Sequence, residues 1–175
     1  MYLVSVYFDK KTEHQIQSYI NDVANSCGNT FMNDHSVPPH MTITAVESIH
    51  EKNLVEAIDC VISNITKNKI EWVTVGIFPA VIFIQPVLNE YLHNLSSVIY
   101  DSIKDVENTK VSKYYKPFSW IPHATIAKQL SEEEMGKAFD VLQKSFGVFE
   151  GEIVRVELAK KNPYRVIASW ELKDE

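Results

Sequence analysis

Two short segments of the chain share a pattern of residue types that suits proton transfer. Each contains proline, histidine, an apolar residue, threonine and isoleucine in that order, at residues 39–43 and 122–126. An imidazole gains and loses a proton near neutral pH, and a threonine hydroxyl can donate a hydrogen bond to an anion. Residues two apart in an extended strand lie on the same face, so we expect the histidine and threonine of each segment to point the same way.

The repetition of the pattern favours a function over a purely structural role. A single histidine in a strand is more often structural, and threonine is common in strands. Among the six histidines, only His40 and His123 have threonine two residues later, as Thr42 and Thr125. Proline makes up roughly 5% of average composition, so two histidines that each follow proline inside one pattern are not expected by chance. We therefore interpret these four residues as a functional set.

The elements around these segments follow one order twice. Alternating or β-branched runs predict strands, and apolar residues three or four apart predict helices. In the first half, strands are expected at 2–8, 40–46 and 69–77, and helices at 12–26 and 51–66. In the second half, strands are expected at 81–87, 123–129 and 149–159, helices at 88–106 and 131–146, and one further strand at 164–172. Each histidine-threonine segment begins the middle strand of its half.

This repeated order predicts a mixed α+β fold. We expect two pseudo-symmetric lobes from a duplicated β-α-β-α-β unit, with mostly antiparallel sheets flanking a central cleft. The repeats are expected at about 1–78 and 80–175, within a single domain that spans residues 1–175. Both histidine-threonine segments would then face the same cleft.

Composition and length exclude several classes of protein. The chain has 175 residues, 45% of them apolar and 23% charged, with a formal net charge of −6, which is typical of a globular domain. No stretch approaches the roughly 20 apolar residues of a membrane span, and no basic leader precedes the first strand. The glycine patterns of dinucleotide- and ATP-binding loops are missing, and the acidic balance opposes non-specific binding of long nucleic acid.

The two cysteines, Cys27 and Cys60, form neither a metal-ligand spacing nor a disulfide framework, which is typical of a reducing compartment. No cluster of metal ligands accompanies either histidine-threonine segment, so no metal and no other cofactor is expected. We therefore expect a cytoplasmic monomer with no membrane partner.

The two segments resemble the motifs of a known family, the 2H phosphoesterase superfamily. Its members, which include 2′-5′ RNA ligase-like proteins and cyclic phosphodiesterases, carry two His-x-Thr/Ser motifs, and PPHMTI and WIPHATIAK match them here. The resemblance implies that His40 and His123 are catalytic and that Thr42 and Thr125 hold the phosphate. Lys128 stands where many members carry arginine; it keeps the positive charge but lacks the two-pronged guanidinium.

The resemblance further implies a metal-independent phosphodiesterase that acts on 2′,3′-cyclic phosphates or 2′-5′ phosphodiester linkages of RNA ends or small nucleotides. Such a reaction needs a base at the attacking oxygen and an acid at the leaving oxygen, roughly in line across phosphorus. Two imidazoles can supply both. By analogy with relatives His40 would be the acid and His123 the base, although the pseudo-symmetry allows the reverse. Run backwards, the same chemistry would join 2′-5′ ends without ATP.

The segment 110–120 is a second candidate for substrate contact. Its lysines alternate with aromatic residues, and from 104 to 128 five lysines outnumber two acidic residues inside an acidic chain. Such a segment can attract a phosphate backbone and stack a base, with Tyr115, Phe118 and Trp120 as the stacking candidates. The alternative is a solvated loop whose aromatic side chains pack underneath it.

A different class of function is also compatible with this pattern, namely a non-catalytic nucleotide- or RNA-binding module that uses the same cleft. The complete histidine and threonine pairs favour the enzyme, because a binding module has no need of paired acid–base groups.

Overall fold

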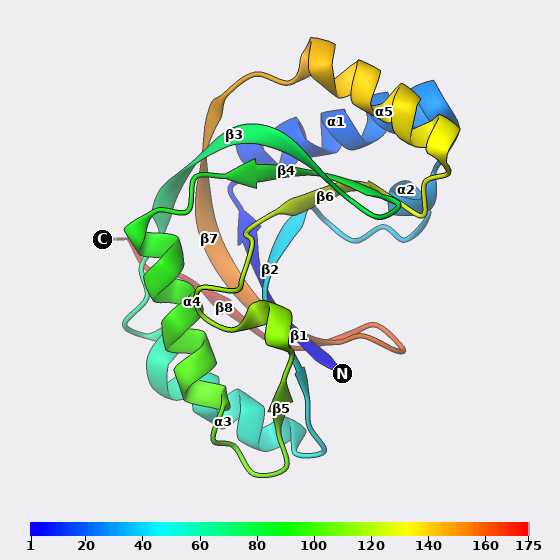
Figure 1. Ribbon diagram of the computed structural model, residues 1–175. Helices are drawn as coiled ribbons and strands as arrows, with labels where there is room; N and C mark the ends of the chain where they lie inside the picture. Colours follow the sequence, from blue (N-terminus) through cyan, green and yellow to red (C-terminus); the bar gives the residue numbers. More distant parts are fainter. Residues whose placement is uncertain (175) are drawn as a thin grey trace.

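The chain runs twice through the order strand, helix, strand, helix, strand and then adds one strand (Figure 1). The computed structural model describes residues 1–174. The first pass contains β1 (Tyr2–Phe8), α1 (Lys10–Cys27), α2 (Phe31–Asp34), β2 (His40–Glu47), α3 (Glu51–Ile62) and β3 (Asn68–Phe78). The second contains β4 (Val81–Pro86), α4 (Glu90–Ile103), β5 (Lys110–Val111), β6 (Ala124–Lys128), α5 (Glu132–Ser145) and β7 (Phe149–Lys160), and β8 (Arg165–Glu171) follows. The predicted mixed α+β class is confirmed, with the short α2 and β5 as additions.

The strands of residues 1–174 belong to one sheet in the order β1-β2-β6-β4-β3-β7-β8, with β5 paired to β2. All of these pairings are antiparallel. Because β7 also pairs with β1, six strands form a closed ring. The third strands are exchanged between the repeats, since β3 pairs with β4 and β7 pairs with β1. Each lobe therefore contains two strands of one repeat and the third strand of the other.

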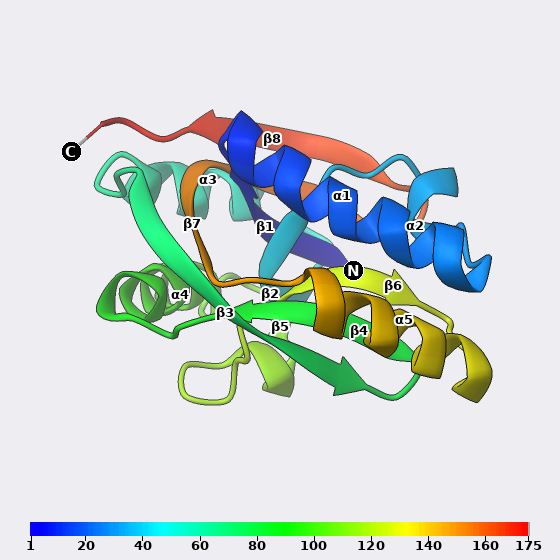
Figure 2. The same ribbon diagram turned by 90° about the horizontal axis from the view of Figure 1, so that it is seen from above.

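The helices pack in two pairs, and each pair takes one helix from either repeat. α1 lies against α5, and α3 lies against α4 (Figure 1, Figure 2). Asp9 caps the first turn of α1, and Gly28, with φ 79°, ends it in the left-handed conformation that glycine tolerates. Between them Ile16, Ile20 and Val23 recur at helical spacing and are buried. The apolar face predicted for this helix therefore packs into the core.

Two helices are shorter than their periodicity predicts. α3 ends at Ile62, and the backbone N–H groups of Asn64 and Ile65 bond to carbonyls three residues earlier, as in a tight turn. Ile65 is buried in the core from this turn. α4 begins only after Asn89, whose side-chain oxygen accepts the backbone N–H of Leu92. The structure of residues 1–174 contains no helix that is long and apolar enough to cross a membrane.

The segment between α4 and β6, for which the sequence predicts neither helix nor strand, is partly regular. It contains β5, which extends the sheet beside β2, and a 3-10 turn at Lys113–Tyr115. The backbone N–H of Ser112 donates to the carbonyl of Ala45 at 2.9 Å, and the indole N–H of Trp120 donates to the carbonyl of Thr42 at 3.0 Å. These bonds hold the segment against the strand that carries the first histidine-threonine pair.

Candidate active site

The two histidine-threonine segments are buried in the same alternating way. In each, the proline, the isoleucine and the residue between histidine and threonine are buried, whereas histidine and threonine are half-buried. That intervening residue, Met41 or Ala124, has no exposed surface. The histidine and threonine of each segment therefore point together to the opposite face of their strand.

The strands that carry these segments are neighbours. β2 and β6 run antiparallel and meet at a single pair of residues, Met41 with Ala124. One step further along this register, the histidine of each segment lies across from the threonine of the other. Residues that are diagonal to one another in such a pair, as the two histidines are, lie about 7–8 Å apart, and their Cβ atoms lie somewhat closer. The structure thus brings both segments to one face at the junction of the two lobes.

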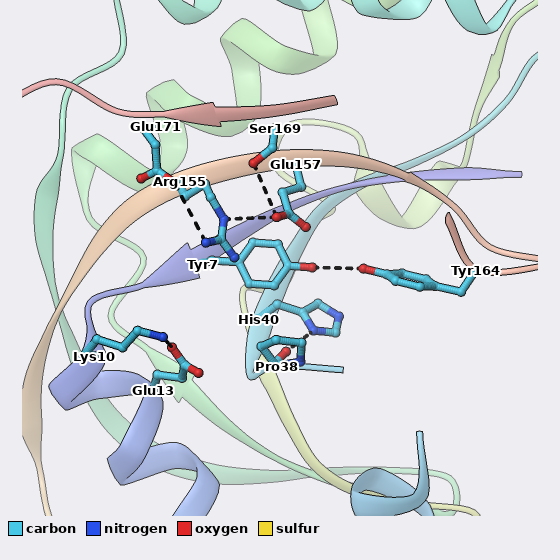
Figure 3. A network of polar contacts seen from close by, with 10 residues as sticks. All are labelled: Tyr7, Lys10, Glu13, Pro38, His40, Arg155, Glu157, Tyr164, Ser169 and Glu171. Carbon is cyan, nitrogen blue, oxygen red and sulfur yellow. Dashed lines mark hydrogen bonds and ion pairs between the residues drawn. The ribbon is translucent and has the colours of Figure 1, made fainter. Parts of the chain in front are cut away.

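Each of the two histidines makes the same hydrogen bond to the backbone. Nδ1 of His40 lies 2.9 Å from the carbonyl oxygen of Pro38, and Nδ1 of His123 lies 2.8 Å from that of Ile121; Figure 3 shows the first. A carbonyl oxygen can only accept, so Nδ1 must carry the hydrogen. Nε2 is then the atom of each ring that can accept or donate a proton.

Each middle strand contains a β-bulge directly after its threonine. Ile43 in β2 and Ile126 in β6 are the extra residues, because the pairing registers with β1 and β4 shift there. A bulge reverses the alternation of side chains, so the fifth residue after each histidine returns to the histidine's face. In β6 that residue is Lys128, whose Nζ lies 4.6 Å from the ring centroid of Phe31, and in β2 it is Ala45. At this position of the strand, the second lobe therefore has a cation where the first lobe has a methyl group.

Burial lowers the pKa of both histidines. For His40, the positive charges of Lys128 and His123 lower the pKa further, while the hydrogen bond to the Pro38 carbonyl and the charge of Glu157 raise it. For His123, the backbone hydrogen bond opposes the effect of burial. Burial and a neighbouring lysine also lower the pKa of Lys128.

His123 borders an aromatic cavity. Its ring centroid lies 5.2 Å from that of Phe78 and 5.1 Å from that of Phe83. The cavity, of about 380 Å³, is lined by His123 and Phe78 together with Tyr115 and Trp120. Neither phenylalanine stands out in the sequence, where the signal is limited to two aromatic residues in the strands on either side of the β3–β4 turn.

The three predicted stacking residues are not all in this cavity. Tyr115 and Trp120 line it, but Phe118 is 89% exposed and lies against His93 instead, with ring centroids 4.6 Å apart. Trp120 is only 6% exposed, and its hydrogen bond to the Thr42 carbonyl also holds its segment against β2.

The first lobe adds a buried hydroxyl, Ser5, for which the sequence pattern gives no signal. Ser5 of β1 lies opposite Thr42, and their two side-chain oxygens are 3.3 Å apart.

Within residues 1–174, the histidine, cysteine, aspartate and glutamate side chains form no group of three that could hold a metal ion.

Comparisons with known proteins give the same fold as these motifs imply. A model of the 2′-5′ RNA ligase superfamily matches residues 12–164. The crystal structure of E. coli LigT complexed with 3′-AMP has a TM-score of 0.61 at 11% sequence identity, with 98% of this chain and 97% of that chain covered. The crystal structure of TT0787 of Thermus thermophilus has a TM-score of 0.60 at 12% identity, with 99% and 98% covered. No curated protein sequence matches the chain.

At such low sequence identities, the two solved structures are evidence for the fold alone. In each comparison the shared fold extends over nearly the full length of this chain and of the solved chain. Because the family model covers most of the sequence, the chain belongs to the 2′-5′ RNA ligase superfamily, the 2H phosphoesterases.

Proposed function

We propose that the chain is a metal-independent phosphodiesterase that acts on 2′,3′-cyclic phosphates or 2′-5′ phosphodiester linkages, at RNA ends or in small nucleotides. The observation that carries this proposal is the matched pair of imidazoles. Each has Nδ1 engaged by a backbone carbonyl, and the two rings belong to the same face of neighbouring strands. One Nε2 can accept the proton of the attacking oxygen while the other donates a proton to the leaving oxygen.

The residues beside the histidines would hold the phosphate. Thr42 and Thr125 can donate hydrogen bonds to the non-bridging oxygens, where negative charge accumulates during the reaction. Ser5, in contact with the Thr42 hydroxyl, would orient it. Lys128 would add a positive charge on the same face, as a point charge rather than a two-pronged donor.

The cavity beside His123 supports a nucleotide as the substrate class. Its aromatic residues Phe78, Tyr115 and Trp120 could stack on a base, an interaction worth about 1–3 kcal/mol. A base at that position would place its ribose oxygens near the phosphorus between the two histidines. The solved relative LigT was complexed with 3′-AMP, a nucleotide.

A binding module without turnover is the second candidate, and the same aromatic cavity favours it. The two available Nε2 atoms favour the enzyme, because binding alone does not need paired proton donors and acceptors. In the enzyme, the reverse reaction would join 2′-5′ ends without ATP.

The test is a panel of nucleoside 2′,3′-cyclic phosphates, 2′-5′ dinucleotides and RNA with cyclic-phosphate ends, assayed in EDTA. We expect turnover by the unaltered protein, and His40→Ala and His123→Ala should each lower kcat by on the order of 10²–10⁴. The double variant should be little worse than either single one, because the two rings act as a unit. His14→Ala, at an exposed position of α1, is the matched control and should keep full activity.

Two results would overturn the proposal. Nucleotides that bind without any turnover across the panel would identify a binding module. Turnover that is lost in EDTA and returns with one added metal would exclude the metal-independent mechanism.

A further inference from the structure

The two motif histidines have the same backbone setting but different neighbours. On the neighbouring strand, Ser5 lies opposite Thr42 in the first lobe. Phe83 lies opposite Thr125 at the equivalent position of the second lobe. On the next strand, Glu157 of β7 lies opposite Ser5, and Gly76 of β3 lies opposite Phe83. The first lobe therefore has a carboxylate where the second lobe has a glycine.

A network of contacts joins this carboxylate to His40 (Figure 3). Nε of Arg155 lies 3.0 Å from the carboxylate of Glu157, and the hydroxyl of Ser169 donates to the same oxygen at 3.4 Å. The guanidinium carbon of Arg155 lies 4.6 Å from the ring centroid of Tyr7, and that ring lies 5.7 Å from the ring of His40. Glu157 is only 9% exposed, and a carboxylate so buried requires partners.

We propose that Glu157 is a positioning residue for His40: held by Arg155, it places a negative charge behind the Tyr7 ring and lets His40 take up a proton beside Lys128, whereas His123 works without such a partner. This inference rests on the proposed function for its meaning in turnover, but it concerns the protonation of the free protein and can be tested without substrate.

The charges around His40 oppose one another. The titratable and charged groups that face His40 or its neighbour Tyr7 are Lys128 and His123 from β6, Tyr7 from β1, Arg155 and Glu157 from β7, and Tyr164 from the β7–β8 hairpin. Lys128 and a protonated His123 disfavour a further positive charge on His40, and Glu157 favours it. Arg155 cancels part of the charge of Glu157.

Tyr7 contributes no charge to this balance. Burial raises its pKa above the usual range, and its hydroxyl lies 3.3 Å from that of Tyr164. The Tyr7 ring therefore separates Arg155 from His40 while it remains a neutral contact of both.

The two opposing charges come from different lobes and have no counterpart at the equivalent position of the other lobe. The position that Lys128 occupies is Ala45 in the first lobe, and the position that Glu157 occupies is Gly76 in the second. The cation of one lobe and the carboxylate of the other thus act on the same histidine. His123, in contrast, packs against two phenylalanine rings.

The experiment is an NMR titration of the histidine Cε1–H resonances in the ligand-free protein, assigned with the His40→Ala and His123→Ala variants. Glu157→Gln should make His40 titrate at lower pH and leave His123 in place. Lys128→Gln should move His40 in the opposite direction, and the double variant should return it toward its original position. The limb of the kcat/KM profile that reports His40 should move with it.

Glu171→Gln is the matched control. It removes the same charge from a carboxylate that also approaches Arg155, at 3.9 Å, but that is largely exposed on β8. Neither histidine should shift in this variant. If Glu157→Gln does not fold because Arg155 loses its partner, Glu157→Asp retains the charge but draws it back from the Tyr7 ring, and His40 should again titrate at lower pH.

Three results would overturn the inference: an unchanged His40 in the folded Glu157 variants, an equal shift of both histidines, or an equal effect of Glu171→Gln. The titration tests the role of Glu157 and the turnover assay tests the proposed function, so one proposal can be rejected without the other. The expected shifts in a protein without turnover would reject the proposed function alone, and turnover without the shifts would reject the role of Glu157 alone.

Discussion

Each motif histidine uses one ring nitrogen to stay in place and has the other available for chemistry. The partner of Nδ1 is a main-chain carbonyl, two residues before the histidine in both segments. The tautomer of both rings is therefore set by the path of the backbone. What differs between the rings is their surroundings, a tyrosine backed by the Arg155–Glu157 ion pair for one and two phenylalanines for the other.

At this scale we expect a bell-shaped pH profile of kcat/KM with its optimum below about pH 6.5, the unperturbed pKa of histidine. Turnover needs one ring neutral and the other protonated. Because burial lowers the pKa of both His40 and His123, the range in which these two states coexist moves to more acidic pH. A phosphodiester substrate keeps its single negative charge throughout this range. Rates measured from about pH 4.5 to 8.5 check the prediction, and an optimum above about pH 7.5 would contradict it.

At the scale of elements, two irregularities position the site. The matched bulges in β2 and β6 set the direction of every residue after the threonines, including Lys128. The β3–β4 hairpin supplies the phenylalanine rings that pack against His123. One of them, Phe83, lies across the hairpin from Gly76. A Cβ atom at position 76 would overlap the Phe83 ring, so this strand position requires glycine.

Gly76→Ala should therefore displace the Phe83 ring and disturb His123. We expect kcat to fall by about 10–100-fold and the free energy of unfolding to fall by about 1–3 kcal/mol. Gly136→Ala is the matched control, because position 136 lies inside α5 with open space around its Cβ. It should raise the free energy of unfolding by about 0.5–1 kcal/mol and leave kcat unchanged. A Gly76→Ala protein with full kcat would show that the Phe83 contact does not matter for turnover.

At the scale of the whole molecule, the exchange of third strands makes the two halves depend on each other. β3 finds its partners in β4 and β7, and β1 pairs with β7 as well as β2. We expect the separate fragments 1–79 and 80–175 to be unfolded alone, because each would expose the apolar faces that the other covers, and to regain the native circular dichroism spectrum when mixed. A fragment with the dispersed NMR spectrum of a folded domain would show instead that the repeats are independent units.

The local features of this protein were determined by its sequence. The order of strands and helices, the repeated unit and the mixed α+β class follow from periods of two and 3.6 residues, which depend only on neighbours in the chain. The shared face of each histidine and threonine follows from the same alternation. The capping box at Ser131 and Glu134 is local in the same sense, because its partners lie within one helical turn.

Which strands pair with one another follows from contacts between segments that are far apart in the sequence. Nothing local indicates that β3 and β7 change places, since pairing is chosen by the burial of all strand faces at once. The bulges that turn Lys128 toward the histidines depend on the partner strands, so alternation counted from the sequence places it on the wrong face. Glu157 looks like any polar residue of a half-exposed strand, and it is buried behind the ring that contacts His40 because Arg155 and β8 pack over it. Local sequence patterns thus identify the side chains that could react, whereas contacts between distant strands set the charges around them.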